Sequence, residues 1–263
     1  MRESTETFQI PIEAAEMYEA AFVPAFFAQW PATLCSAAGV APGRRVLDVA
    51  CGTGIVTRTA ADQGATVTGV DLNKAMLTVA RRVRPELDWR QGNAQALPCD
   101  DDSFDVVVSQ MALMFFPDPA AALAEMARVV VPGGTVAVLV PGALEHQPAF
   151  APFVAMAARH AGPEAVDLLT TYFRCGDLAA LAGLLAAAGP TVTVQRTEDG
   201  TYRAPSVDAF VTTEVESTPL VERLSAETYQ GIRDEAKAVL APFTAADGSV
   251  AAPFESNLVV AVA

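Results

Sequence analysis

Residues 46 to 55 place a glycine-containing turn directly after an apolar run, and this pattern constrains the fold more than any other part of the chain. The apolar residues that flank Asp48 predict a strand buried in a parallel sheet. Gly52 and Gly54 let the backbone approach a ligand closely, and a helix is expected to begin near Thr53. A strand, a glycine turn and a helix in this order predict an α/β domain with a nucleotide site at the end of the strand.

A second carboxylate, Asp71, closes the next apolar strand about twenty residues later. At that position it can accept hydrogen bonds from both hydroxyls of a ribose. The dinucleotide fingerprint would place a third glycine three positions after Gly54, but the chain has Thr57 there. A ligand without a pyrophosphate does not need that glycine, so the loop fits a nucleoside better than NAD.

Apolar and helical segments alternate along the chain. Residues 12 to 38 predict short N-terminal helices interrupted by Pro24 and Pro31, and the alanine-rich residues 141 to 189 predict an inserted helical cap. The expected strands are 45 to 50, 66 to 71, 87 to 91, 104 to 109, 135 to 140, about 191 to 203, and 256 to 262. The other expected helices are 53 to 63, 74 to 83, 119 to 130, about 207 to 216, and about 226 to 241.

Charge and cysteine content exclude several classes of protein. The net charge of −14, from 31 acidic and 17 basic residues, disfavours binding to nucleic acid or to anionic membrane. Four cysteines without a CxxC pair indicate neither a structural zinc nor a disulfide framework, which suits a reducing cytoplasm. Residues 1 to 6 are acidic and lack the apolar core of a secretory signal, and no unbroken apolar run is long enough to span a membrane.

With these motifs the chain resembles the class I S-adenosylmethionine-dependent methyltransferases, and more narrowly the small-molecule group that includes the ubiquinone and menaquinone C-methyltransferases. The resemblance is strong over residues 40 to 142 and weak in the flanks. It implies an α/β fold, with a Rossmann-like, seven-stranded, mostly parallel sheet whose last strand is antiparallel. It also implies a single domain over residues 1 to 263, with N-terminal helices in 1 to 40, a cofactor-binding core in 41 to 142, a helical cap in 143 to 189, and C-terminal strands and helices in 190 to 263.

The resemblance further implies S-adenosyl-L-methionine as the cofactor and assigns its contacts by matching positions. The acid and the loop that would carry its methionine part are Asp48, Ala50, Gly52 and Gly54, and the acid that would bind its ribose is Asp71. The adenine ring would lie between the apolar side chains of Leu72 and Met76 and the turn formed by Asn93 and Ala94. Ser109 begins the segment after the fourth strand that would line the cofactor. The family usually has glycine at position 50 and an acid at position 93. An amide oxygen at Asn93 can accept the same hydrogen bond without charge.

Two residues outside those motifs are also predicted to serve the site. The hydroxyl of Tyr18 needs a polar partner if it is buried, and the cofactor carboxylate offers one. His146 follows the fifth strand at the ligand-binding edge and is the predicted general base for a phenolic acceptor, whereas His160 lies in a cap helix. A solvent-exposed histidine is the simpler alternative for His146, and Glu145 and Tyr172 are further candidates of the same kind.

The expected function is methylation of an apolar or aromatic small molecule on oxygen or carbon. An adaptable acceptor pocket is predicted from Met111, Met114, Phe115, Phe150, Phe153, Met156 and Phe173. Two alternatives stay open: an NAD(P)-dependent reductase, which would want a third glycine and a Tyr/Lys or Ser/Tyr pair, and a non-catalytic nucleoside-binding protein. We expect a small-molecule acceptor as partner, allow for a homodimer, and expect no metal, no nucleic acid and no membrane insertion.

Overall fold

The computed structural model describes residues 9–216 and 220–263 and divides into two compact units, which are described separately. Unit 1 contains the described residues up to Leu139, together with Ala179–Arg196 and Leu258–Ala263. Unit 2 contains the described residues of Val140–Leu178 and Thr197–Asn257. Residues 1 to 6, which argued against a secretory signal, lie outside the described part, and the single domain over residues 1 to 263 stays a prediction.

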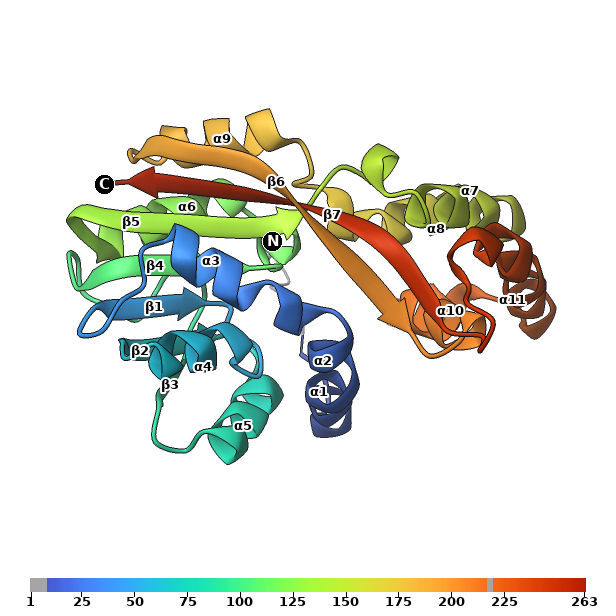
Figure 1. The fold of residues 1–263 in the computed structure, drawn as a ribbon, viewed down its shortest axis with the longest axis horizontal. Coiled ribbons are helices and arrows are strands. Elements are labelled where there is room, and N and C mark those ends of the chain that lie inside the picture. The colour runs from blue at the N-terminus through green and yellow to red at the C-terminus, as the bar shows by residue number, and fades with distance from the viewer. Residues whose placement is uncertain (1–8, 217–219) are drawn as a thin grey trace, which may run out of the picture. The chain divides into compact units, whose positions relative to one another are not determined.

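Seven strands form one sheet (Figure 1). They are β1 Arg45–Val49, β2 Thr66–Asp71, β3 Asp88–Gln91, β4 Phe104–Gln110, β5 Val130–Pro141, β6 Thr191–Ala204 and β7 Val250–Val262, in the order β3-β2-β1-β4-β5-β7-β6. Strands β1 to β5 pair in parallel. The Ala263 amide donates to Gly134 O and the Gly133 amide donates to Ala263 O, a reciprocal pattern that makes β7 antiparallel to β5. The predicted sheet is therefore confirmed.

The register of the central strands brings their carboxyl ends to one edge of the sheet. Asp48 of β1 is level with Gly69 of β2 and Val108 of β4. Most side chains of these strands are apolar and buried, as expected for strands covered on both faces. The residues that follow β1, β2, β3 and β4 therefore meet at the same edge.

The helices of unit 1 are α1 Ile12–Met17, α2 Val23–Ala25, α3 Pro31–Ala37, α4 Ile55–Asp62, α5 Lys74–Val83, α6 Pro119–Val129 and α9 Leu178–Ala187. Individual bounds were predicted for α4, α5 and α6, and these helices begin and end within two residues of the prediction. A π-helical turn, Tyr18–Phe22, separates α1 from α2, and a 3-10 turn, Phe27–Gln29, precedes α3. Asn73 caps α5 by accepting hydrogen bonds from two backbone amides, and Asp118 caps α6 in the same way with one.

The starts of three elements differ from the sequence expectation. Strand β7 begins at Val250, six residues before its predicted start at residue 256. Helix α4 begins at Ile55 because Gly54 precedes it in a left-handed conformation. Strand β5 begins at Val130 and continues through the predicted loop 131 to 134, and a register shift between Phe104 and Val106 of β4 absorbs the extra residues. Helix α9 lies in unit 1 from Ala179 onwards, although the sequence placed it in the cap.

Unit 2 is built around a cluster of aromatic rings. Its helices are α7 Phe150–Ala161, α8 Pro163–Leu169, α10 Val207–Glu216 and α11 Ala226–Val239, and its short 3-10 turns are Leu144–His146, Thr171–Phe173, Val221–Arg223 and Ala241–Phe243. The Phe150 ring lies within 5.7 Å, between centroids, of the rings of Phe173, Tyr202, Phe210 and Phe254. Throughout residues 9–216 and 220–263, no helix has both the length and the apolar character needed to cross a membrane.

A buried carboxyl group beside this cluster makes the stability of unit 2 depend on pH. Glu214 accepts a hydrogen bond from the Tyr202 hydroxyl, and its burial raises its pKa to about 7. Since this pKa is higher in the folded state than in the unfolded state, the folded state holds the extra proton between about pH 4.5 and pH 7. The stability that protonated Glu214 contributes is therefore present below that window and lost as pH rises through it.

As pH rises from 5 to 8, the free energy of unfolding of Glu214→Gln is expected to increase by about 3 kcal/mol relative to that of the natural chain. The reason is that glutamine does not ionise, so the variant does not lose stability through deprotonation at position 214. Urea unfolding at several pH values measures the difference. Glu216→Gln, on the exposed side of the same helix, is the control and should show no such pH-dependent gain. A constant difference between Glu214→Gln and the natural chain across this range would contradict the prediction.

Candidate functional site

The turn after β1 holds three residues in the left-handed backbone region. Ala50 has φ 58°, Gly52 has φ 57° and Gly54 has φ 91°. Glycine adopts these angles without penalty, whereas alanine pays about 1 kcal/mol or more. The strain at Ala50 explains why the family usually has glycine there, and such strain is typical of functional loops.

Asp71, at the end of β2, holds the turn in place. Its Oδ2 accepts a hydrogen bond from the Gly52 amide at 2.8 Å, and its Oδ1 accepts one from the Asn73 amide at 2.7 Å. Burial raises the pKa of Asp71, while these two backbone hydrogen bonds oppose the rise. Each carboxylate oxygen keeps a second lone pair that can accept from a ligand hydroxyl. The acid predicted to bind ribose is therefore also the residue that orients the glycine turn.

Asp48 lies beneath the turn and is buried. Its Oδ2 accepts hydrogen bonds from the Thr57 amide at 3.0 Å and from the Thr57 hydroxyl at 2.6 Å. Burial raises the pKa of Asp48 to about 7, against the effect of the Thr57 hydrogen bonds. Thr57 occupies the place of the third glycine in a dinucleotide loop, and here its side chain fixes the first strand to the first turn of α4.

The indole ring of Trp89 fills a slot whose walls are glycines. A methyl group at Gly54 would come within 2.2 Å of the Trp89 ring, and one at Gly69 would come within 2.7 Å of it. Cys51 packs in the same cluster as Trp89 and is buried, which raises the pKa of its thiol well above the usual value. Cys51 is thus a packing residue, and Gly54 is required by the core as well as by the turn.

The N-terminal segment is attached to the glycine turn by an arginine that sequence analysis missed. Arg58 of α4 donates from Nη1 to the Thr53 carbonyl oxygen at 2.8 Å and from Nη2 to Glu19 Oε1 at 2.9 Å. Tyr18 lies beside the turn, because a methyl group at Gly52 would be 3.9 Å from its hydroxyl oxygen. The π-helical turn that contains Tyr18 and Glu19 brings both residues to this position.

The residues predicted to surround adenine lie at the ends of β2 and β3. Leu72 and Met76 are partly exposed, and Ala94 is buried. Asn93 is exposed, and its Oδ1 accepts a hydrogen bond from the Gln95 amide at 2.9 Å, which closes a tight turn. The amide oxygen of Asn93 keeps one lone pair that can accept a hydrogen bond from adenine. The contact between Asn93 and adenine stays a prediction.

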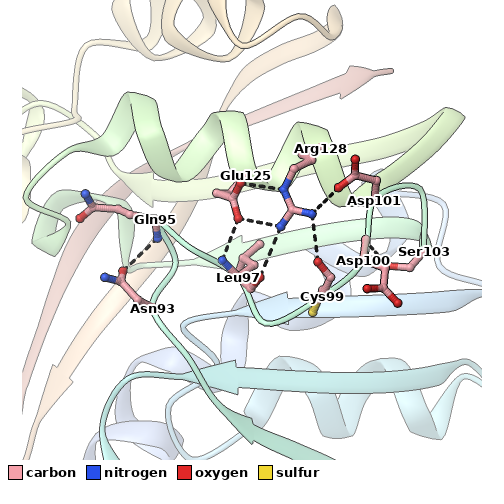
Figure 2. A network of polar contacts seen from close by, with 9 residues as sticks. All are labelled: Asn93, Gln95, Leu97, Cys99, Asp100, Asp101, Ser103, Glu125 and Arg128. Atoms are coloured by element: carbon pink, nitrogen blue, oxygen red, sulfur yellow. Dashed lines mark hydrogen bonds and ion pairs between the residues drawn. The ribbon is translucent and has the colours of Figure 1, made fainter.

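Figure 2 shows the polar network that follows this turn. Arg128 of α6 contacts the carboxylates of Glu125 and Asp101 and donates to the Leu97 and Cys99 carbonyl oxygens. Glu125 in turn accepts from the Leu97 amide at 2.8 Å. These contacts raise the pKa of Arg128, so its charge is permanent. The network fixes the backbone between the adenine turn and β4, and nothing in the local sequence pattern indicated it.

The end of β4 is fixed by backbone contacts. The Ser109 hydroxyl donates to the Val49 carbonyl oxygen at 2.9 Å and is buried, so Ser109 ties β4 to β1. Met111 has φ 53°, a strained conformation for a side chain of this size, and its amide donates to Leu139 O at 2.7 Å. Phe115, two residues beyond the buried Leu113, is 47% exposed. A contact between Ser109 and the cofactor stays a prediction.

His146 of unit 2 is paired with a carboxylate that sequence analysis missed. Its Nδ1 lies 3.0 Å from Glu255 Oε1. Gln147 is buried and clamps the backbone of Glu255, because its Nε2 donates to Glu255 O at 2.8 Å and its Oε1 accepts from the Glu255 amide at 3.0 Å. His160, the other histidine, pairs with Glu235 at 2.7 Å. Glu145 is exposed and Tyr172 is partly buried.

The acceptor-pocket residues fall into two sets. Met111 and Met114 are buried in unit 1, and Phe150, Phe153, Met156 and Phe173 are buried in unit 2. In unit 2, the packing of Phe150, Phe153 and Phe173 on other aromatic rings accounts for the burial of these three side chains. Their contact with an acceptor stays a prediction.

A doubly covered parallel sheet, a glycine turn after β1 and an acid after β2 define a nucleoside-binding α/β protein of the Rossmann-like class. A family model described as "Methyltransferase domain" matches residues 47–138. The chain is 44% identical over 125 residues to the demethylmenaquinone methyltransferase of Renibacterium salmoninarum, which covers 48% of this chain and 51% of that protein. It is also 36% identical over 174 residues to the demethylmenaquinone methyltransferase of Beutenbergia cavernae, and this alignment covers 61% of the present chain and 71% of the relative.

The chain therefore belongs to the class I S-adenosylmethionine-dependent methyltransferases. The first of these matches spans about half the length of the relative. A solved structure of Haemonchus contortus phosphoethanolamine N-methyltransferase 2 in complex with S-adenosyl-L-methionine has a TM-score of 0.59 at 21% identity, covering 96% of this chain and 57% of that one. This similarity confirms the fold.

Proposed function

We propose that the protein transfers a methyl group from S-adenosyl-L-methionine to a ring carbon of an apolar quinol-type small molecule. The observation that carries this proposal is the contact between Asp71 and the Gly52 amide, because it joins the acid proposed to bind ribose to the glycine turn. The two relatives named demethylmenaquinone methyltransferase favour a quinol acceptor. Methylation of the hydroxyl oxygen of a related phenol is the alternative reaction proposed for the same site.

The residues of the site fit such a donor. The bound sulfonium would supply a methyl group already activated for in-line displacement. The chain's own part is positional, because aligning the acceptor with the methyl group provides much of the rate. Asp71 and the turn from Ala50 to Gly54 would hold the nucleoside, and Leu72 and Met76 would contact the adenine ring. Thr53 Oγ1 is buried without a protein partner, which indicates a polar ligand group beside the turn.

Calorimetric titration with S-adenosylhomocysteine tests the proposed cofactor. We expect binding in the micromolar range and no response to NADPH, because the loop lacks the glycine that a pyrophosphate requires. Tight binding of NADPH with no response to either sulfur nucleoside would overturn the proposal in favour of a reductase. A chain that binds the sulfur nucleosides but methylates no quinol or phenol would favour the non-catalytic alternative.

The general base of this proposal is His146, with Glu255 holding its Nδ1 and leaving Nε2 to take a proton from the acceptor hydroxyl. We expect His146→Ala to lower kcat about a hundredfold, within the usual range for a lost general base, and to leave the affinity for S-adenosylhomocysteine unchanged. Glu255→Gln should lower kcat less, because the imidazole remains. Methyl-transfer assays with saturating donor measure both effects.

His160→Ala is the matched control, since His160 also pairs with a glutamate but lies on α7. It is expected to retain the natural kcat. If His146→Ala turns over at the natural rate, the base lies elsewhere or the reaction needs none.

A cytoplasmic location is proposed on the ground that all four cysteines are free thiols. A homodimer and the lack of affinity for nucleic acid stay predictions.

A further inference from the structure

Several buried polar atoms have no hydrogen-bond partner, and some of them belong to residues in the glycine turn or linked to it. Among the side chains of residues 9–216 and 220–263, such atoms are Glu19 Oε2, Trp30 Nε1, Thr53 Oγ1, Gln110 Oε1 and Ser256 Oγ. The first four belong to unit 1, and Ser256 belongs to unit 2. Buried polar atoms are nearly always paired in native proteins, so a group of orphans calls for a ligand or water that completes it.

Two of these side chains are connected to the turn directly. Thr53 is part of the turn and is 1% exposed. Glu19 is connected through Arg58, which binds Glu19 Oε1 and the Thr53 carbonyl oxygen at the same time. The ion pair uses one carboxylate oxygen of Glu19 and leaves the other without a partner.

The other two are connected through the aromatic rings of the N-terminal segment. Gln110 Nε2 donates to the Phe27 carbonyl oxygen at 3.2 Å, and the Phe27 ring lies 4.9 Å from the ring of Tyr18, the residue beside Gly52. The Phe26 ring lies 5.1 Å from the Phe27 ring and 6.4 Å from the Trp30 ring. Gln110 and Trp30 are thus linked to the N-terminal segment that also contains Tyr18 and Glu19.

The chemistry of the four atoms matches a free amino acid. Glu19 Oε2 and Gln110 Oε1 are acceptors, and Glu19 is anionic, so they suit an ammonium group. Thr53 Oγ1 and Trp30 Nε1 can both donate, so they suit a carboxylate. Two acceptors and two donors fit a zwitterion better than they fit a neutral or singly charged ligand.

We propose that Glu19 and Gln110 accept hydrogen bonds from the α-ammonium group of the donor, and that Thr53 and Trp30 donate to its α-carboxylate. This inference rests on the proposed function and names residues beyond the glycine turn. It makes Glu19 a specificity-determining residue, which distinguishes a sulfur nucleoside with an amino-acid end from one without it.

The test compares two ligands that differ only in that end. S-Adenosylhomocysteine has the amino acid, and 5′-methylthioadenosine keeps the adenosine and sulfur but lacks it. In calorimetric titrations of the full chain, Glu19→Gln is expected to raise the Kd of S-adenosylhomocysteine about tenfold, as the loss of a charged hydrogen bond predicts. The Kd of 5′-methylthioadenosine should change less than about twofold. Thr53→Val, which removes only the hydroxyl, should behave in the same way.

Glu16→Gln is the matched control, because Glu16 lies three residues from Glu19, pairs with Arg82 and is exposed. It is expected to change neither Kd. Thr53→Val should also keep or raise the melting temperature of the ligand-free chain, since it deletes an unpaired hydroxyl. Equal weakening of both ligands by Glu19→Gln and Thr53→Val would overturn the inference and leave the cofactor proposal standing. A natural chain that binds neither ligand would overturn both.

Discussion

Replacing Gly54 with alanine is expected to destabilise the chain by about 3 kcal/mol or more. Two costs combine at this position. A side chain at φ 91° is strained, which costs about 1 to 2 kcal/mol, and the new methyl group would meet the Trp89 ring at 2.2 Å. Overpacking of this kind costs about 1 to 3 kcal/mol. Urea unfolding followed by circular dichroism measures the loss.

Gly133→Ala separates the two costs. Gly133 has φ 77° in the same unit, and a methyl group there would meet nothing within 4 Å. This variant should lose only the conformational part, about 1 kcal/mol. Trp89→Leu in the Gly54→Ala background should recover part of the stability, because it opens the slot. Equal losses in Gly54→Ala and Gly133→Ala would show that the Trp89 contact carries no cost.

Replacing Asp71 with alanine is expected to weaken the binding of S-adenosylhomocysteine at least tenfold. The variant loses the acceptor proposed for the ribose hydroxyls and leaves the Gly52 amide without the partner that orients the turn. Asp71→Asn should also bind more weakly, because the amide nitrogen that replaces one oxygen cannot accept from a backbone N–H. Calorimetric titration gives both values.

Asp88→Asn, at the start of the neighbouring strand β3, is the control for a general effect of charge. Its side chain contacts Arg90 and Thr68, and neither of these residues belongs to the glycine turn. We expect its affinity to match that of the natural chain. Natural affinity in Asp71→Ala would remove the observation on which the proposed function depends.

The sheet and the core helices could be predicted because their signals are local. The strands that begin at Arg45, Thr66 and Phe104 are rich in valine and leucine, and α5 and α6 begin at capping residues that the sequence displays. The glycine turn and Asp71 were recognisable for the same reason, since their spacing along the chain is fixed. Tyr18 was predicted to contact the cofactor carboxylate, which stays a prediction; its position beside the turn is compatible with it, but the π-helical turn that brings it there was not predicted.

The remaining features depend on contacts between residues far apart in the chain. Glu255 reaches His146 across 109 positions, and Glu19 reaches Arg58 across 39. No periodicity or spacing encodes such a pair, because each partner alone resembles an ordinary surface charge. Ser109 shows the opposite case: its position matched a cofactor motif, but its hydroxyl is used between two strands.

The slot between Gly54 and Gly69 also gives the chain an optical reporter. The sequence contains two tryptophans, Trp30 and Trp89, and both lie in unit 1, one in the N-terminal segment and the other against the glycine turn. Indole emission therefore originates from unit 1, the unit that holds the proposed donor site. Changes in that emission during a titration can be assigned to this unit without introducing a label.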